Sequence, residues 1–161
     1  TWKSRGLGDV YKRQPLGCMG VGVPFAIGSK VAYPDRQVVL ISGDGAVGMN
    51  LMEFESAVRH NIPFLCIVCN DKSWGMTKHQ HWLNYGKENT PAGHEMPFIK
   101  FHEIVKSMGG YGELVEDPKD LIPAIERSIK SGLPSLINVL TNPDATSAAT
   151  HAITAMMTPK E

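Results

Sequence analysis

Two acidic residues that each follow an apolar run are the feature of this sequence most able to do chemistry. Asp44 comes just after the run VVLIS (38–42), and Asp71 comes just after a second run, 64–69. Because parallel strands end at the same edge of a sheet, we expect the two carboxylates to lie close together. Two neighbouring carboxylates need a cation, and Mg²⁺ prefers oxygen ligands and keeps positions for water or phosphate oxygens. The pair predicts a Mg²⁺ site.

Glycines surround the first of these acids. Gly43, Gly45 and Gly48 let backbone N–H groups approach an anion, beside the amino end of a helix expected to start near Leu51. Taken singly, a Gly-Asp-Gly is more often a turn and a loop aspartate is more often solvated. The combination indicates a site for a diphosphate and a metal ion.

Alternating strands and helices would position these residues. The runs 38–42 and 64–69 are continuously apolar and predict buried parallel strands. Between them Asn50 and Glu53 resemble a capping box ahead of apolar residues at helical spacing, which completes a βαβ unit. Further helices are expected over 24–32, 98–108 and 118–131, strands over 113–116 and 136–140, and a terminal helix from Asn142. The predicted fold class is α/β, with an open, mostly parallel sheet flanked by helices.

Composition narrows the function classes. Among 161 residues, sixteen basic groups balance sixteen acidic groups, which argues against a nucleic-acid or anionic membrane partner. No apolar run approaches the roughly 20 residues of a membrane span, and no signal peptide is visible, so we expect a cytoplasmic protein. Residues 1–14 lack any periodicity and resemble a non-native linker, so the domain is assigned to residues 15–161.

Two longer stretches carry a family resemblance. The stretch GDGAVGMNLMEFESAVRHNIPFLCIVCNDKSWGM (43–76) resembles the diphosphate-binding motif of thiamine-diphosphate enzymes, which runs from Gly-Asp-Gly to an Asn-Asn pair. The stretch GCMGVGVPFAIGSK (17–30) is similar to the matching segment of acetohydroxyacid synthases and related 2-oxo-acid decarboxylases. The resemblance covers about residues 15–140 and implies the thiamine-diphosphate-binding fold, with thiamine diphosphate and Mg²⁺ as cofactors.

The resemblance also implies roles for individual residues. Asp44, Asp71 and the carbonyl oxygen of Ser73 would ligate Mg²⁺, although the family usually has Asn at the position of Asp71. Met19 would wedge between the two cofactor rings and hold them bent, and the carbonyl of Gly17 would accept a hydrogen bond from the cofactor's amino group. The implied cofactor-binding residues are Gly17, Cys18, Met19, Gly43, Asp44, Gly45, Ala46, Asn70, Asp71, Ser73, Gly75 and Met76.

The implied activity is that of an enzyme that decarboxylates or ligates 2-oxo acids, similar to acetolactate synthase. Activities like those of 2-hydroxyacyl-CoA lyase, oxalyl-CoA decarboxylase or benzoylformate decarboxylase are alternatives, because Gln80 stands where acetohydroxyacid synthases have Trp. The glutamate that activates the cofactor matches no residue here; in the family it comes from the pyrimidine-binding domain of a second subunit. We therefore expect a fragment that is inactive alone, in a homodimer or homotetramer that acts on a small 2-oxo acid or acyl-CoA.

Two alternative functions, from other classes of protein, stay open. Gly20 and Gly22 begin a G-x-G ahead of Asp44, as in NAD-dependent oxidoreductases, but Phe25 replaces the third glycine. A non-catalytic regulatory subunit that kept the fold is the other.

Several other residues are expected to have structural roles and no part in the chemistry. Cys66 and Cys69 lie on opposite faces of a strand and are expected to pack, not to bind metal. His79 and His81 are expected at the surface, and the stretch 83–97 could form a lid.

Overall fold

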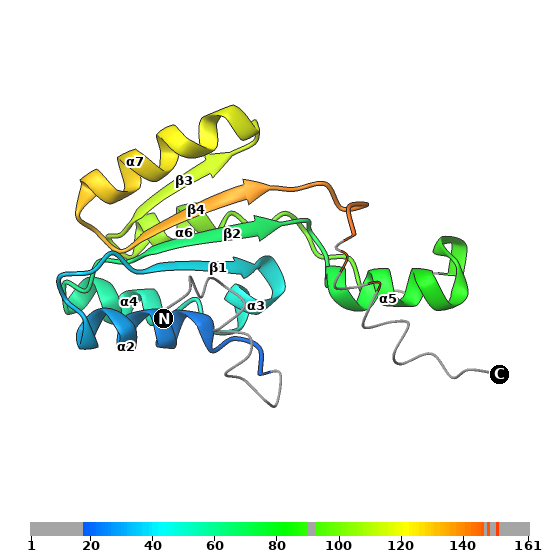
Figure 1. Cartoon of the computed structure of the whole chain (residues 1–161), viewed down its shortest axis with the longest axis horizontal. Coiled ribbons are helices and arrows are strands. Elements are labelled where there is room, and N and C mark those ends of the chain that lie inside the picture. The colour runs from blue at the N-terminus through cyan, green and yellow to red at the C-terminus, as the bar shows by residue number, and fades with distance from the viewer. Residues whose placement is uncertain (1–17, 90–92, 147, 149–150, 152–161) are drawn as a thin grey trace, which may run out of the picture.

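One parallel sheet organises the chain. The computed structural model describes residues 18–89, 93–146, 148 and 151. Within them four strands pair in the order β1-β2-β4-β3, all parallel (Figure 1). The strands are β1 (Val39–Gly43), β2 (Leu65–Asn70), β3 (Tyr111–Val115) and β4 (Ser135–Leu140). The predicted α/β class with an open parallel sheet is confirmed.

Helices cover both faces of this sheet. On one face lie α2 (Gly22–Ala32), α4 (Glu53–Arg59) and α6 (Phe101–Ser107), and on the other lies α7 (Leu121–Ser131) (Figure 1). The short α3 (Asp44–Met49) follows β1, and α5 (Gly75–Tyr85) extends beyond the carboxyl ends of the strands (Figure 1). Two 3₁₀ turns, Lys87–Asn89 and Pro118–Asp120, complete the described elements. No helix in this described part is long and apolar enough to cross a membrane.

Two apolar layers hold the helices on the sheet. In the larger layer, Phe54 of α4 and Phe101 of α6 pack with Val68 of β2. In the smaller layer, Ala124 of α7 packs with Ile67 of β2. Both faces of β2 are therefore buried, which explains its continuously apolar sequence.

The prediction that the run 38–42 forms a buried strand is only half right. The strand is parallel, but β1 lies at the edge of the sheet, and Val39 and Ile41 are 48% and 39% exposed. Apolar composition alone does not reveal which strand lies at an edge.

The predicted start of the helix after Asp44 is also wrong. Residues 44–49 already form α3, and α4 begins at Glu53 without a side-chain cap. The side chain of Asn50 instead donates to the carbonyl of Gly20 at 2.9 Å, because the segment before α2 lies beside it. Residues 1–14, Gly17 and most of the tail predicted to be helical lie outside the described residues. Of the described tail, residues 142–146 form no helix, whereas Ala148 and His151 are helical.

Candidate functional site

The two predicted acidic segments meet at the carboxyl end of the sheet. Asp44 is the first residue of α3 and is 4% exposed. Its Oδ1 accepts a hydrogen bond from Gly45 N at 2.8 Å, and its Oδ2 accepts one from Lys72 N at 2.9 Å. Because Lys72 directly follows Asp71, this second bond ties the loop after β2 to the start of α3. Asp44 and the Asp71 loop therefore lie side by side, as the positions of the two strand ends predicted.

Negative charge is concentrated here. Burial raises the pKa of the Asp44 carboxyl, and the nearby charge of Asp71 raises it further, while backbone N–H groups oppose the change. Partial burial, and then the charges of the same two acids, also raise the pKa of the Cys69 thiol at the end of β2, whose side chain stays partly exposed. A cation beside the two carboxylates would offset the repulsion that disfavours the ionised form of Asp44. No cluster of three or more His, Cys, Asp or Glu suited to a metal is found among the described residues.

The loop that carries Asp71 is held in one shape. Asp71 Oδ1 accepts a hydrogen bond from Ser73 N at 3.0 Å, and Lys72 adopts a left-handed backbone with φ 58°. Trp74 N donates to the carbonyl of His94 at 2.8 Å, and Met96 N donates to that of Lys72 at 2.8 Å. Part of the stretch predicted to be a lid, 83–97, therefore fastens this loop instead, and residues 83–85 complete α5.

The residues around the two acids fit a bound metal and diphosphate. Ser73 is 3% exposed, and its hydroxyl oxygen has no hydrogen-bond partner among the described residues. A methyl group at Gly75 would lie against Asp71 Oδ2, and one at Gly45 would lie 2.6 Å from the ring of Trp74. The site thus combines a buried hydroxyl that has no partner among the described residues with two glycines at which a side chain would displace Asp71 or Trp74. The Gly45 N–H, predicted to contact phosphate, is already bonded to Asp44.

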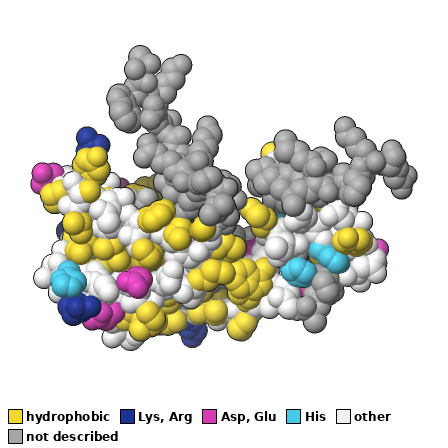
Figure 2. Space-filling view, turned by 90° about the horizontal axis from the view of Figure 1, so that it is seen from below, with side chains coloured by type: hydrophobic (Ala, Val, Ile, Leu, Met, Phe, Trp, Pro, Cys, Tyr) yellow, Lys and Arg dark blue, Asp and Glu magenta, His cyan; other side chains and the backbone are white. Residues whose placement is uncertain are grey.

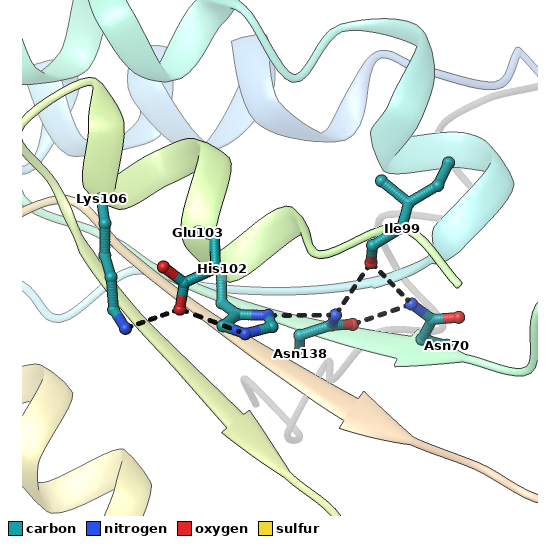
Figure 3. Close-up of polar contacts among 6 residues, drawn as sticks. All are labelled: Asn70, Ile99, His102, Glu103, Lys106 and Asn138. Carbon is teal, nitrogen blue, oxygen red and sulfur yellow. Dashed lines mark hydrogen bonds and ion pairs between the residues drawn. The ribbon is translucent and has the colours of Figure 1, made fainter. Parts of the chain in front are cut away.

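Asn70 has a different place from the one that the resemblance implied. It is 1% exposed, and its Nδ2 donates to Asn138 Oδ1 at 3.0 Å and to the carbonyl of Ile99 at 3.3 Å (Figure 3). Its Oδ1 accepts from Lys72 N at 3.1 Å. Its hydrogen-bonding groups are engaged inside the protein, so the side chain positions the loop.

Sequence reasoning missed Asn138 and His102, which continue these contacts. Both are buried, Asn138 in β4 and His102 in α6. The available signal was a polar residue inside an apolar strand run, since buried polar groups need partners.

The remaining predicted residues lie around this centre. Met19 is 52% exposed, next to Gly20, whose carbonyl is bonded to Asn50 just after α3. Gly75 and Met76 form the first turn of α5. Also placed by the structure are Cys18 and Gly43, both exposed, and Ala46, which is half-buried.

The histidines and cysteines named from the sequence differ in how deeply they are buried. His79, predicted to be a surface residue, is 5% exposed and bonds to the carbonyl of Pro143 at 2.8 Å, because α5 packs against the segment after β4. His81 bonds to the carbonyl of Asn89 at 3.0 Å. Cys66 is buried as expected, and burial raises the pKa of its thiol, whereas Cys69 is exposed.

Comparison with known proteins agrees with this geometry. Residues 2–139 match the family described as "Thiamine pyrophosphate enzyme, C-terminal TPP binding domain", thiamine pyrophosphate being another name for thiamine diphosphate. A Mycobacterium bovis protein named "Probable acetolactate synthase" is 43% identical over 129 residues, 80% of this chain and 23% of that protein. The 2-hydroxyacyl-CoA lyase of Oryza sativa is 35% identical over 132 residues, 80% of this chain and 23% of the relative.

A solved structure extends the comparison. The thiamine diphosphate-dependent 4-hydroxybenzoylformate decarboxylase of Rhodococcus jostii matches with a TM-score of 0.72 and 29% identity, over 80% of this chain and 24% of that one. The chain therefore spans about a quarter of the length of these relatives. The resemblance and the cofactor predicted from the sequence are confirmed: the chain belongs to the family of C-terminal thiamine-diphosphate-binding domains of thiamine-diphosphate enzymes.

Proposed function

We propose that this domain binds the Mg²⁺–diphosphate end of thiamine diphosphate in an enzyme that decarboxylates or ligates 2-oxo acids, similar to acetolactate synthase. Activities like those of 2-hydroxyacyl-CoA lyase, oxalyl-CoA decarboxylase or benzoylformate decarboxylase are the alternatives. The observation that carries the proposal is the meeting of Asp44 with the Asp71 loop through the bond from Lys72 N.

In this proposal Asp44, Asp71 and the carbonyl oxygen of Ser73 hold the metal. When bound, the cofactor supplies a carbon nucleophile that stabilises the charge formed as a bond next to a carbonyl breaks. Met19 would wedge between the two rings of the cofactor, and the carbonyl of Gly17 would accept a hydrogen bond from its amino group. The diphosphate binds near the first turn of α5, where backbone N–H groups at a helix start favour anions.

A second subunit completes the proposed enzyme. Its pyrimidine-binding domain supplies the activating glutamate, and the substrate is a small 2-oxo acid or acyl-CoA. Exposed apolar side chains support such a partner: Phe25, Met49 and Met52 are 53%, 51% and 68% exposed. Figure 2, which views the molecule from the side of α2 and α4, shows hydrophobic side chains gathered on this face. The homodimeric or homotetrameric state and the cytoplasmic location stay predictions.

A binding titration of the intact protein tests the proposal. We expect saturable binding of thiamine diphosphate, followed by tryptophan fluorescence, that disappears when Mg²⁺ is chelated, because the metal joins the diphosphate to the carboxylates. NADH is the competing ligand, and tighter binding of NADH would overturn the proposal. Cofactor binding by an assembled protein that turns over no 2-oxo acid or acyl-CoA would identify the non-catalytic subunit.

Replacing Asp71 by Asn, the residue usual in the family, separates charge from coordination. Asp71→Asn keeps an oxygen ligand but removes one negative charge, so we expect Mg²⁺ to bind roughly fivefold more weakly, an effect of about 1 kcal/mol for a partly screened charge. Asp71→Ala removes the ligand as well, and we expect a larger loss. Titrations of Mg²⁺ at fixed cofactor compare the two. Equal losses in both variants would show that Asp71 is not a ligand.

A further inference from the structure

A chain of hydrogen bonds runs from the candidate site to the surface of α6, and Figure 3 shows the part of it from Asn70 to Lys106. Lys72 N donates to both Asp44 Oδ2 and Asn70 Oδ1, at 2.9 and 3.1 Å. Asn70 Nδ2 donates to Asn138 Oδ1 at 3.0 Å, and Asn138 Nδ2 lies 3.3 Å from His102 Nδ1. The chain therefore links a ring on α6 to a proposed metal ligand.

The outer end of the chain lies at the surface. His102 Nε2 lies 3.4 Å from Glu103 Oε1, which also pairs with Lys106 at 2.8 Å. The two asparagines share a further acceptor, the carbonyl of Ile99, at 3.3 Å from Asn70 Nδ2 and 3.1 Å from Asn138 Nδ2.

These bonds have one direction. An asparagine side chain has two donor hydrogens on nitrogen and one acceptor oxygen. Asn70 uses its oxygen for Lys72 N and its nitrogen for Asn138 and Ile99, and Asn138 uses its oxygen for Asn70. Asn138 Nδ2 must then donate to His102 Nδ1, so this ring nitrogen carries no proton and the proton lies on Nε2.

We propose that neutral His102 is a positioning residue that fixes the direction of this chain and thereby holds the Lys72 N–H on Asp44. A protonated ring would carry hydrogens on both nitrogens and would place a donor against Asn138 Nδ2. If the side-chain amide of Asn138 flipped to offer its oxygen to the ring, its nitrogen would face the nitrogen of Asn70. If the amide of Asn70 then flipped as well, its nitrogen would face the Lys72 N–H. Each rearrangement leaves a buried donor unpaired, which is costly.

Burial and the charges around the ring set the pH at which His102 becomes protonated. Burial lowers the pKa of His102, Glu103 raises it, and Lys106 and Lys100 lower it. Asn138 of β4 is uncharged, Gly112 of β3 packs on the backbone of His102, and Glu113 of β3 pairs with Arg127 of α7. Because the folded-state pKa is below the unfolded value, the network's contribution to stability is full above the unfolded pKa, about 6.5, and is lost as the pH falls through the folded pKa.

A titration without cofactor tests the direction of the chain. In the intact protein labelled with ¹⁵N, we expect the Lys72 backbone amide and the side-chain amides of Asn70 and Asn138 to shift with the same midpoint as His102. The side-chain amide of Asn50, which bonds to Gly20, serves as a reference that does not follow His102. Unmoved Asn70 and Asn138 amides across the titration of His102 would overturn the inference.

Two substitutions connect the network to cofactor affinity, a step that rests on the proposed function. His102→Asn keeps an acceptor oxygen near the place of Nδ1 but cannot titrate, whereas His102→Leu leaves one of the two Asn138 Nδ2 hydrogens without an acceptor, the other staying on the carbonyl of Ile99. With saturating Mg²⁺ at neutral pH, we expect the Leu variant to bind thiamine diphosphate about 5- to 30-fold more weakly, as for one unpaired buried donor. The Asn variant should bind within about threefold of wild type, since its acceptor is kept.

Binding measured at lower pH then distinguishes a positioning role of His102 from a role in packing alone. As the pH falls, the affinity of wild type for thiamine diphosphate should drop with the midpoint at which His102 becomes protonated. The Asn variant should lack this drop, and Glu103→Gln should move it to lower pH, because Glu103 raises the pKa of His102. A folded Leu variant that binds like wild type, or an Asn variant that keeps the acid step, would overturn the inference. If wild type binds no thiamine diphosphate, the proposed function fails, and the cofactor-free titration still decides on the network.

Discussion

Asp44→Ala is expected to abolish Mg²⁺-dependent binding of thiamine diphosphate, with an affinity more than about 100-fold below that of wild type, because even residues outside the ligand shell cost 10- to 100-fold. The substitution removes one of the two carboxylates proposed to hold the metal. It also removes the acceptor of Gly45 N and one of the two acceptors of Lys72 N, so the Asp71 loop loses its tie to α3. Titrations of the intact protein by tryptophan fluorescence, with and without Mg²⁺, measure the loss.

A surface acid provides the matched control for this substitution. Asp35 lies exposed in the turn after α2, and Asp35→Ala removes the same charge away from the site. We expect it to bind the cofactor like wild type. Asp44→Asn removes the charge but keeps an acceptor oxygen for only one of the two backbone N–H groups, so a loss smaller than that of Asp44→Ala measures what this remaining oxygen contributes. Binding by Asp44→Ala within about threefold of wild type, well short of the cost of a lost ligand, would refute the metal assignment.

The parts of this site that follow from local rules could be predicted from the sequence. Asp44 and Asp71 each follow a β-branched apolar run, and the parallel order of β1 and β2 brings both runs to one edge of the sheet. Strand periodicity and the geometry of the βαβ unit suffice for that step, since neither depends on the rest of the chain. The same rules located β2, β4, α2 and α7.

The parts that depend on distant contacts could not be predicted. Asn70 and Asn138 are 68 positions apart, and nothing near either residue indicates that their amides bond to each other. Asn50 resembled a helix cap because its sequence neighbours fit that pattern, but the carbonyl of Gly20, 30 positions away, takes its side chain. Buried polar side chains choose partners across the whole fold, so local spacing does not identify them.

The position of His102 depends on Gly112, the second residue of β3. Gly112 is buried, and a methyl group there would lie against the carbonyl oxygen of His102 and 2.7 Å from its carbonyl carbon. Backbone cannot move aside as a flexible side chain can, so Gly112→Ala must push α6 away from the sheet. We expect a loss of about 3 kcal/mol in the free energy of unfolding, the upper part of the range for overpacking. Urea unfolding measures it.

Gly28 offers the control that separates this clash from the general effect of replacing glycine by alanine. It lies in α2, is exposed, and a methyl group there would meet nothing within 4 Å. Gly28→Ala should therefore stabilise the protein by about 0.5–1 kcal/mol, because alanine loses less backbone freedom in a helix. If the two substitutions changed stability alike, the close approach of β3 to α6 would be wrong. A loss confined to Gly112→Ala, joined by displaced His102 and Asn138 resonances, would show that this backbone contact sets the ring against the buried chain that ends at Asp44.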